Sequence, residues 1–172
     1  LVKHKDGTQT LETVWEREPW GFMYQWQICL GGICCFGRRW EELFYLIDVI
    51  TQEWRLSELK RLVIYVHNLG FELHFLYPFF FQKYGAEGVK IFATKEHQPV
   101  YVLLPCGIEL RCSWKLTNMN LYMFTHTELG SPYEKAYGDL DYKQIRTANT
   151  PLTMEEKGYC LLDVLALWHS IK

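Results

Sequence analysis

The stretch Arg61–Glu72, RLVIYVHNLGFE, decides the fold predicted for this chain. Residues 61–66 form a continuous run rich in β-branched side chains, which is typical of a strand buried on both faces. The run passes through His67–Gly70 into a segment with helical spacing over residues 71–84. A buried strand that leads through a short turn into a helix indicates an α/β protein, in which ligands lie at the carboxyl ends of such strands.

The flanking sequence supplies further strands and helices. Gly31 and Gly32 separate two β-prone runs within residues 22–35, and two glycines favour a tight hairpin turn. Thr153 and Glu156 match a capping box that starts a helix over residues 154–171. The other predicted elements are a strand at 10–15, a helix at 40–54, strands at 89–93, 99–104 and 108–112, a short helix at 116–124 and an extended surface segment at 127–152. The expected architecture is a mixed sheet flanked by helices.

The composition narrows the class of protein. The chain has 172 residues, of which 49% are hydrophobic and 22% charged, and its formal net charge is -2. Its length suits one domain, and its composition excludes general disorder and a histone-like grip on DNA. The longest apolar stretch, 75–81, contains Pro78, whereas a membrane span needs about 20 residues. Six cysteines without a CxxC pair, and an opening segment unlike a secretory leader, predict reduced thiols in a cytosolic protein.

The predicted closing helix carries the first candidate site residues. Tyr159 and Asp163 are four residues apart on a helix that is apolar almost all round. A carboxylate in such surroundings loses hydration worth several kcal/mol unless it is paired, hydrogen-bonded or bound to a metal. The alternative is that Asp163 lies on a narrow polar stripe with Gly158 and Ser170, or accepts a bond from a nearby backbone amide.

Two further acidic residues lie on other elements. Glu72 falls in the first turn of the helix that follows the buried strand; in the alternative interpretation, Asn68 caps this helix and Glu72 complements its dipole. Glu12 lies on the possible strand at 10–15, and alone it is an ordinary surface residue. Together Glu12, Glu72 and Asp163 match the acidic clusters that hold Mg²⁺ through oxygen ligands. Two such ions catalyse phosphodiester cleavage.

Several segments of the sequence resemble the exonuclease motifs of protein-primed family B DNA polymerases of phages and mobile elements. The second motif is matched by residues 65–72, and the third by Tyr159-x-x-x-Asp163. Residues 21–27, 111–119 and 139–142 are also similar to segments of that family. The resemblance covers nearly the whole chain, and its five short motifs occur in the family's order.

The resemblance implies a ribonuclease H-like (DnaQ-like exonuclease) fold and a proofreading 3′-to-5′ exonuclease, a hydrolase that binds nucleotides and DNA. Glu12, Glu72 and Asp163 would hold two Mg²⁺ or Mn²⁺ ions, and Tyr159 would orient the attacking water. The positions that match contacts to a single-stranded DNA 3′ end are Thr13, Asn68, Phe71 and Ser113. Phe71 would offer a stacking face, unless it simply belongs to the core.

The resemblance also implies a partner domain and a cellular location. The polymerase half of such enzymes has no counterpart in residues 1–172, so we expect a single exonuclease-type domain whose partner is that polymerase domain. The expected location is the cytoplasm of a bacterial cell or of a phage-infected host.

The chain departs from the family pattern at two places. The first motif of the family begins with Asp, and Thr10 stands there instead, without the charge that bridges two cations. The family's catalytic Lys is out of register, because Tyr137 occupies its place and Lys135 lies two residues earlier. Weak exonuclease activity is therefore expected.

Two alternative functions remain open. The first is a catalytically degenerate nuclease fold that binds nucleic acid or protein. The second is a zinc module built from Cys34, Cys35, Cys106 and Cys112 with scattered histidines, although the spacing of these cysteines fits known zinc sites poorly.

Overall fold

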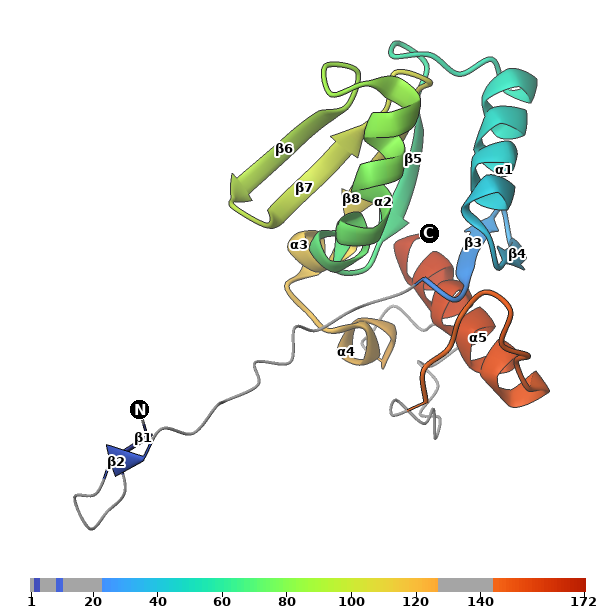
Figure 1. The fold of residues 1–172 in the computed structure, drawn as a ribbon. Coiled ribbons are helices and arrows are strands. Elements are labelled where there is room, and N and C mark those ends of the chain that lie inside the picture. Colours follow the sequence, from blue (N-terminus) through green and yellow to red (C-terminus); the bar gives the residue numbers. More distant parts are fainter. Residues whose placement is uncertain (1, 4–8, 11–22, 127–143) are drawn as a thin grey trace.

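The computed structural model describes residues 2–3, 9–10, 23–126 and 144–172. Its largest sheet has four strands in the order β5-β8-β7-β6 (Figure 1). The strand predicted from the sequence is β5, Leu62–Val66, which lies at one edge and pairs in parallel with β8, Ile108–Cys112. The expectation that it is buried on both faces is wrong, because all five of its residues are only half-buried. Antiparallel pairing then adds β7, Gln98–Leu103, and β6, Lys90–Lys95. The predicted mixed α/β architecture is confirmed.

The other edge of this sheet is β6, which is exposed along its whole length. Lysines stand at both of its ends, and two apolar side chains between them, Ile91 and Phe92, are 38% and 51% exposed. Its register with β7 shifts twice, on either side of Ala93.

The predicted hairpin is also confirmed, and it forms a sheet of its own. Strands β3, Trp26–Leu30, and β4, Ile33–Gly37, pair antiparallel around Gly31 and Gly32, whose φ angles of 59° and 86° favour glycine. Cys29 and Cys34 face each other in this register and form a disulfide. The prediction that all six cysteines are reduced is therefore wrong for this pair, because hairpin pairing brings the two side chains together on one face.

Helix α2, Leu69–Tyr84, covers one face of the four-stranded sheet, where it packs against β7 and β8. Helix α1, Trp40–Glu53, contacts α2. The two helices contact each other through rings such as Phe44 and Phe80, whose centroids are 6.0 Å apart. Buried side chains of the helices and of the sheet, including Leu69, Phe80 and Ile108, form the core.

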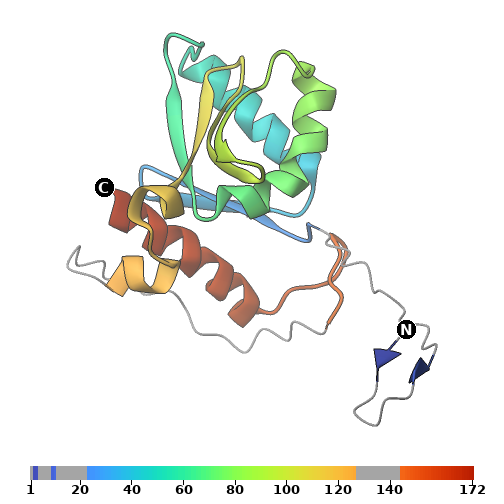
Figure 2. The ribbon, with the colours of Figure 1, turned by 90° about the vertical axis from the view of Figure 1, so that its left-hand side faces the viewer.

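The last helix lies beside the hairpin. Helix α5, Met154–Ile171, packs against β3, β4 and β5, and Figure 2 shows the hairpin between α5 and the group formed by α1, α2 and β5. Its predicted start is confirmed: the Thr153 hydroxyl accepts a bond from the Glu156 amide at 3.1 Å, and the Glu156 carboxylate accepts one from the Thr153 amide at 2.8 Å. None of the helices in the described segments is long and apolar enough to cross a membrane.

Two predicted elements differ from the structure. The single helix expected at 116–124 is two helices, α3, Ser113–Thr117, and α4, Leu121–His126, because Asn118 adopts a left-handed conformation with φ of 55° that ends α3. The strand expected at 10–15 shares only Thr10 with a strand of the structure. Thr10 is the last residue of β2, Gln9–Thr10. That strand pairs with β1, Val2–Lys3, in a separate sheet, and residues 11–15 lie outside the described ranges.

Candidate functional site

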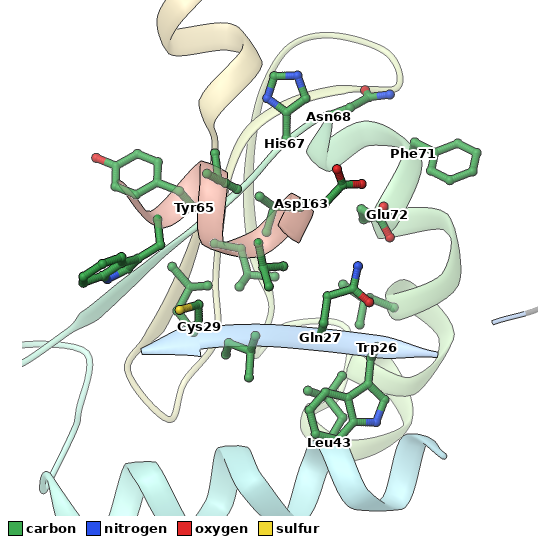
Figure 3. A pocket seen from close by; sticks show the side chains of 18 of the residues that line it. Trp26, Gln27, Cys29, Leu43, Tyr65, His67, Asn68, Phe71, Glu72 and Asp163 are labelled. Carbon is green, nitrogen blue, oxygen red and sulfur yellow. The ribbon is translucent and has the colours of Figure 1, made fainter. Parts of the chain in front are cut away.

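A cavity of about 1060 Å³ lies between the hairpin and the four-stranded sheet (Figure 3). Its walls come from the strands β3, β5 and β8 and from the helices α1 to α5. His67 and Asn68, which follow the carboxyl end of β5, are among its lining residues. This is the place at which α/β sheets hold their ligands.

Glu72 and Asp163 both line this cavity. Glu72 projects from the first turn of α2 and Asp163 from the middle of α5, and Figure 3 shows both carboxyl groups directed into the same space. The Glu72 side chain reaches solvent through the cavity, yet protein atoms crowd it, and this loss of hydration raises the pKa of its carboxyl above the usual range. Glu12 and Thr13 lie outside the described residues.

Tyr159 lies one turn before Asp163 on α5 and is partly buried. Its neighbour Cys160, rather than Tyr159 itself, lines the cavity. Burial raises the pKa of the Cys160 thiol, and it likewise raises the pKa of Tyr24, whose hydroxyl bonds Cys160. Tyr24 and Cys160 thus join the loop before β3 to α5 beside the two carboxylates.

Asn68 and Phe71 stand at the mouth of the cavity. Asn68 is the N-cap residue of α2, as the alternative interpretation expected, and its carbonyl oxygen accepts a bond from the Phe71 amide at 2.9 Å. Its backbone is left-handed with φ of 61°, and its side chain makes no cap bond to the helix. Phe71 is 58% exposed and meets Phe75 edge-on with ring centroids 5.4 Å apart. The alternative that Phe71 belongs to the core is therefore wrong, and its ring face is accessible to a ligand.

Ser113 differs from the other predicted contact residues because it is fully buried. Its Oγ lies 3.1 Å from Nδ1 of His67 and 3.4 Å from the carbonyl oxygen of Val66, to which it donates. The parallel register of Val66 with Cys112 brings these residues together at the ends of β5 and β8. In this structure Ser113 reaches the cavity through His67, a lining residue that the sequence analysis did not single out.

The described side chains limit which metal ions this part of the chain could bind. Within residues 23–126 and 144–172, no three His, Cys, Asp or Glu side chains gather into a cation site. The zinc alternative is wrong, because its four cysteines are all described and do not cluster, and Cys34 is in a disulfide. The remaining donor set, Glu72 and Asp163, offers the oxygen ligands that Mg²⁺ and Mn²⁺ prefer.

No family model and no curated protein matches this chain. Two solved structures match, both of phi29 DNA polymerase: one in a ternary complex with primer-template DNA and incoming nucleotide substrates, the other with single-stranded DNA. Each has a TM-score of 0.61 and covers 81% of this chain, at 15% and 17% sequence identity. The chain spans 25% of the length of that polymerase. This chain thus shares the fold of part of phi29 DNA polymerase, in agreement with the predicted ribonuclease H-like class.

Proposed function

We propose that residues 1–172 form a 3′-to-5′ exonuclease-type domain related to those of protein-primed family B DNA polymerases. The observation that carries this proposal is the convergence of Glu72 and Asp163, from α2 and α5, in one cavity of a polymerase-like fold. Its partners would be a single-stranded DNA 3′ end and a polymerase domain. Such a domain would act in the cytoplasm of a bacterium or of a phage-infected host.

Glu72 and Asp163, with Glu12 as the third carboxylate, would hold divalent Mg²⁺ or Mn²⁺. The donor chemistry fits, because these hard cations take carboxylate oxygens and retain water. The raised pKa of Glu72 also fits, since a crowded carboxylate gains from a nearby positive charge. When bound, two such ions activate a water molecule and stabilise the leaving oxygen in phosphodiester hydrolysis.

The remaining roles fall to residues around the cavity. The exposed ring of Phe71 would stack on a base at the 3′ end, and the Asn68 amide would bond the same strand. Tyr159 would orient the attacking water, one helical turn from Asp163. Ser113 would position His67 instead of touching DNA, because its hydroxyl is buried. Stacking matters here since the net charge of -2 gives little general attraction for phosphates.

Thr10 favours a second candidate function. A hydroxyl in place of the first Asp lacks the charge expected to bridge two cations, so the chain as it stands would hydrolyse DNA weakly. A nuclease fold that has lost activity but keeps its exposed Phe71 would still bind single-stranded nucleic acid. A protein-binding role is the other form of this alternative.

One experiment separates these functions. The unmodified chain, Thr10→Asp and Thr10→Asp/Asp163→Asn are incubated with a single-stranded oligonucleotide labelled at its 5′ end, with Mn²⁺. We expect little release of nucleotides by the unmodified chain, a clear gain in Thr10→Asp, and loss of that gain in the double variant. Robust hydrolysis by the unmodified chain would contradict the assigned effect of Thr10. A folded Thr10→Asp protein that binds the oligonucleotide without cleaving it would favour the binding module.

A further inference from the structure

Arg38 joins two parts of the chain that lie far apart in the sequence. It follows β4, and its guanidinium donates from Nε to the carbonyl oxygen of Tyr24, just before β3. From Nη2 it donates to the carbonyl oxygens of Thr147 and Thr150, 109 and 112 residues away, at 2.8 and 2.7 Å. These threonines precede α5. We call Arg38 and its three carbonyl partners the arginine clamp.

The far side of the arginine clamp is a turn fixed to the start of α5. The Thr150 amide donates to the Thr147 carbonyl at 3.0 Å, and the Thr147 amide donates to Oγ1 of Thr150 at 2.9 Å. Next to this turn, Arg146 donates from Nε and Nη2 to one carboxylate oxygen of Glu156, at 2.9 and 2.7 Å. Both of these side chains are largely buried, so salt screens the ion pair little. The turn therefore moves together with the first turn of α5.

The near side of the arginine clamp leads to the middle of α5. Arg38 holds the carbonyl group of Tyr24, and the Tyr24 hydroxyl bonds the thiol of Cys160. Cys160 lies three residues before Asp163 on α5, so both project from the same face of the helix. Tyr24, Cys160 and Asp163 all line the cavity. Arg38 therefore acts on α5 at two places, its first turn and the turn that precedes Asp163.

The position of α5 matters because the two carboxylates come from different helices. Glu72 projects from α2, which packs against the four-stranded sheet, whereas Asp163 projects from α5, which packs against the hairpin. Oxygen ligands lie within about 2.0 to 2.6 Å of a divalent cation. A displacement of α5 by about 1 Å relative to α2 would take one carboxylate out of this range. The contacts that fix α5 therefore decide whether one cation can reach both carboxylates.

We propose that Arg38 is a positioning residue: the arginine clamp sets the place of Asp163 relative to Glu72, and so the affinity of this site for a divalent cation. This role rests on the function proposed above, and Arg38 itself contacts neither cation nor DNA. The planar fork of the guanidinium carries the role, because its nitrogens bond carbonyl groups on two separate segments. A lysine at this position would keep the charge but lose the fork.

Four variants test the role of the arginine clamp. Arg38→Ala removes it, and Arg38→Lys keeps the charge without the fork. Arg39→Ala is the matched control, since it removes an exposed arginine at the next position. The amides of residues 38 and 39 both donate to Glu42, and these backbone bonds survive each substitution. Ile50→Val, which removes a methyl group from the core, controls for a general loss of stability.

The first measurement is made in EDTA without DNA, so it does not depend on a bound cation. The free thiols of the whole chain are alkylated under native conditions, and the rate at each cysteine is read by mass spectrometry of the peptides. Cys160 and Cys112 are both buried, 5% and 4% exposed, but Cys160 bonds Tyr24 whereas Cys112 belongs to the core cluster. In Arg38→Ala and Arg38→Lys, Cys160 should react at least about tenfold faster and Cys112 at its normal rate. An unchanged rate at Cys160 would overturn the proposal, and so would equal acceleration at both cysteines.

The second measurement is the affinity for Mn²⁺ alone, followed by the electron paramagnetic resonance signal of the free ion. Arg38→Ala and Arg38→Lys should bind Mn²⁺ at least about tenfold more weakly than the unmodified chain, the cost typical of losing a residue that orients a metal ligand. Arg39→Ala and Ile50→Val should keep the affinity. Ethylguanidinium, which supplies the missing fork, should restore the affinity of Arg38→Ala, whereas ethylammonium should not.

The Mn²⁺ affinities separate a failure of this role from a failure of the proposed function. If the unmodified chain binds Mn²⁺ and Arg38→Ala binds it equally well, the arginine clamp only stabilises the fold and the proposal is overturned. Restoration by ethylammonium, or full affinity in Arg38→Lys, would overturn the role of the fork. If the unmodified chain binds no Mn²⁺, the function proposed above fails, and the positioning role fails with it.

Discussion

Oγ of Ser113 lies 3.1 Å from Nδ1 of His67, although 46 residues separate them in the sequence. The Ser113 hydroxyl donates to the carbonyl oxygen of Val66, so it accepts from His67 and favours the tautomer protonated at Nδ1. The Nε2 atom of His67 is then the nitrogen with a lone pair.

Replacing Ser113 tests this arrangement. Ser113→Ala should lower the free energy of unfolding by about 1 to 2 kcal/mol, because a buried hydrogen-bonded group loses its partner. The measurement is chemical denaturation together with the ¹⁵N shifts of the His67 ring, which report the tautomer. Ser113→Thr retains the hydroxyl and serves as the control. Unchanged ring shifts in folded Ser113→Ala would show that the serine does not set the tautomer.

Phe71 should contribute to binding and little to stability. Its ring is 58% exposed, whereas Phe80 on the same helix is 1% exposed. Phe71→Ala should weaken the binding of a short single-stranded oligonucleotide roughly tenfold or more, since a stacked base is worth about 1 to 3 kcal/mol. Phe80→Ala should instead lower stability by about 3 to 5 kcal/mol. Both affinities are measured with Ca²⁺ to prevent cleavage, and an unchanged affinity in Phe71→Ala would remove its assigned role.

The pH dependence of stability should carry the signature of Glu72. Because crowding raises the pKa of Glu72 in the folded chain, its contribution is greatest below the unfolded value, near 4.3, and is lost as pH rises through the folded value. Without metal, Glu72→Gln should therefore have a higher Tm than the unmodified chain at pH 7, and the difference should vanish near pH 4. Mg²⁺ should raise the Tm of the unmodified chain more than that of the variant. Equal Tm values at both pH values would contradict this explanation.

The disulfide between Cys29 and Cys34 gives a chemical prediction. Of the six cysteines, four have free thiols, so the denatured chain should titrate four thiols before reduction and six afterwards. Reduction should lower the free energy of unfolding by up to about 2 kcal/mol, because the bond closes a short loop in the unfolded chain. Thermal unfolding of a Cys29→Ser/Cys34→Ser variant, with and without reductant, checks this. Six titratable thiols before reduction would disprove the bridge.

Features with local causes could be predicted from the sequence. Helix α5 begins at Met154 as expected because Thr153 and Glu156 satisfy each other's amides within one turn. The hairpin follows from two adjacent glycines, and β5 with α2 follows from residues 61–84. Asp163 could be selected because it is a carboxylate on an apolar helix, and Glu72 because it falls in the first turn of the helix that follows the predicted strand.

Features that depend on register or tertiary contacts could not be predicted in this way. The partnership of Ser113 with His67 requires the parallel alignment of β8 with β5, and the disulfide requires the pairing of Cys29 with Cys34. The break between α3 and α4 depends on a left-handed Asn118, a conformation that asparagine adopts only in some contexts. The exposure of Phe71 depends on where α2 begins relative to the end of β5.

Strand β6 has a consequence for the behaviour of the protein in solution. Lys90 and Lys95 bracket its apolar residues, and the two register shifts beside Ala93 bend the backbone out of the flat geometry that fibril growth requires. Lys90 is paired with Glu58 at 2.6 Å, so Lys95 supplies the charge that repels a second copy along this edge. We therefore expect concentrated samples to stay monodisperse at low ionic strength, and the first aggregates to form as salt screens this charge.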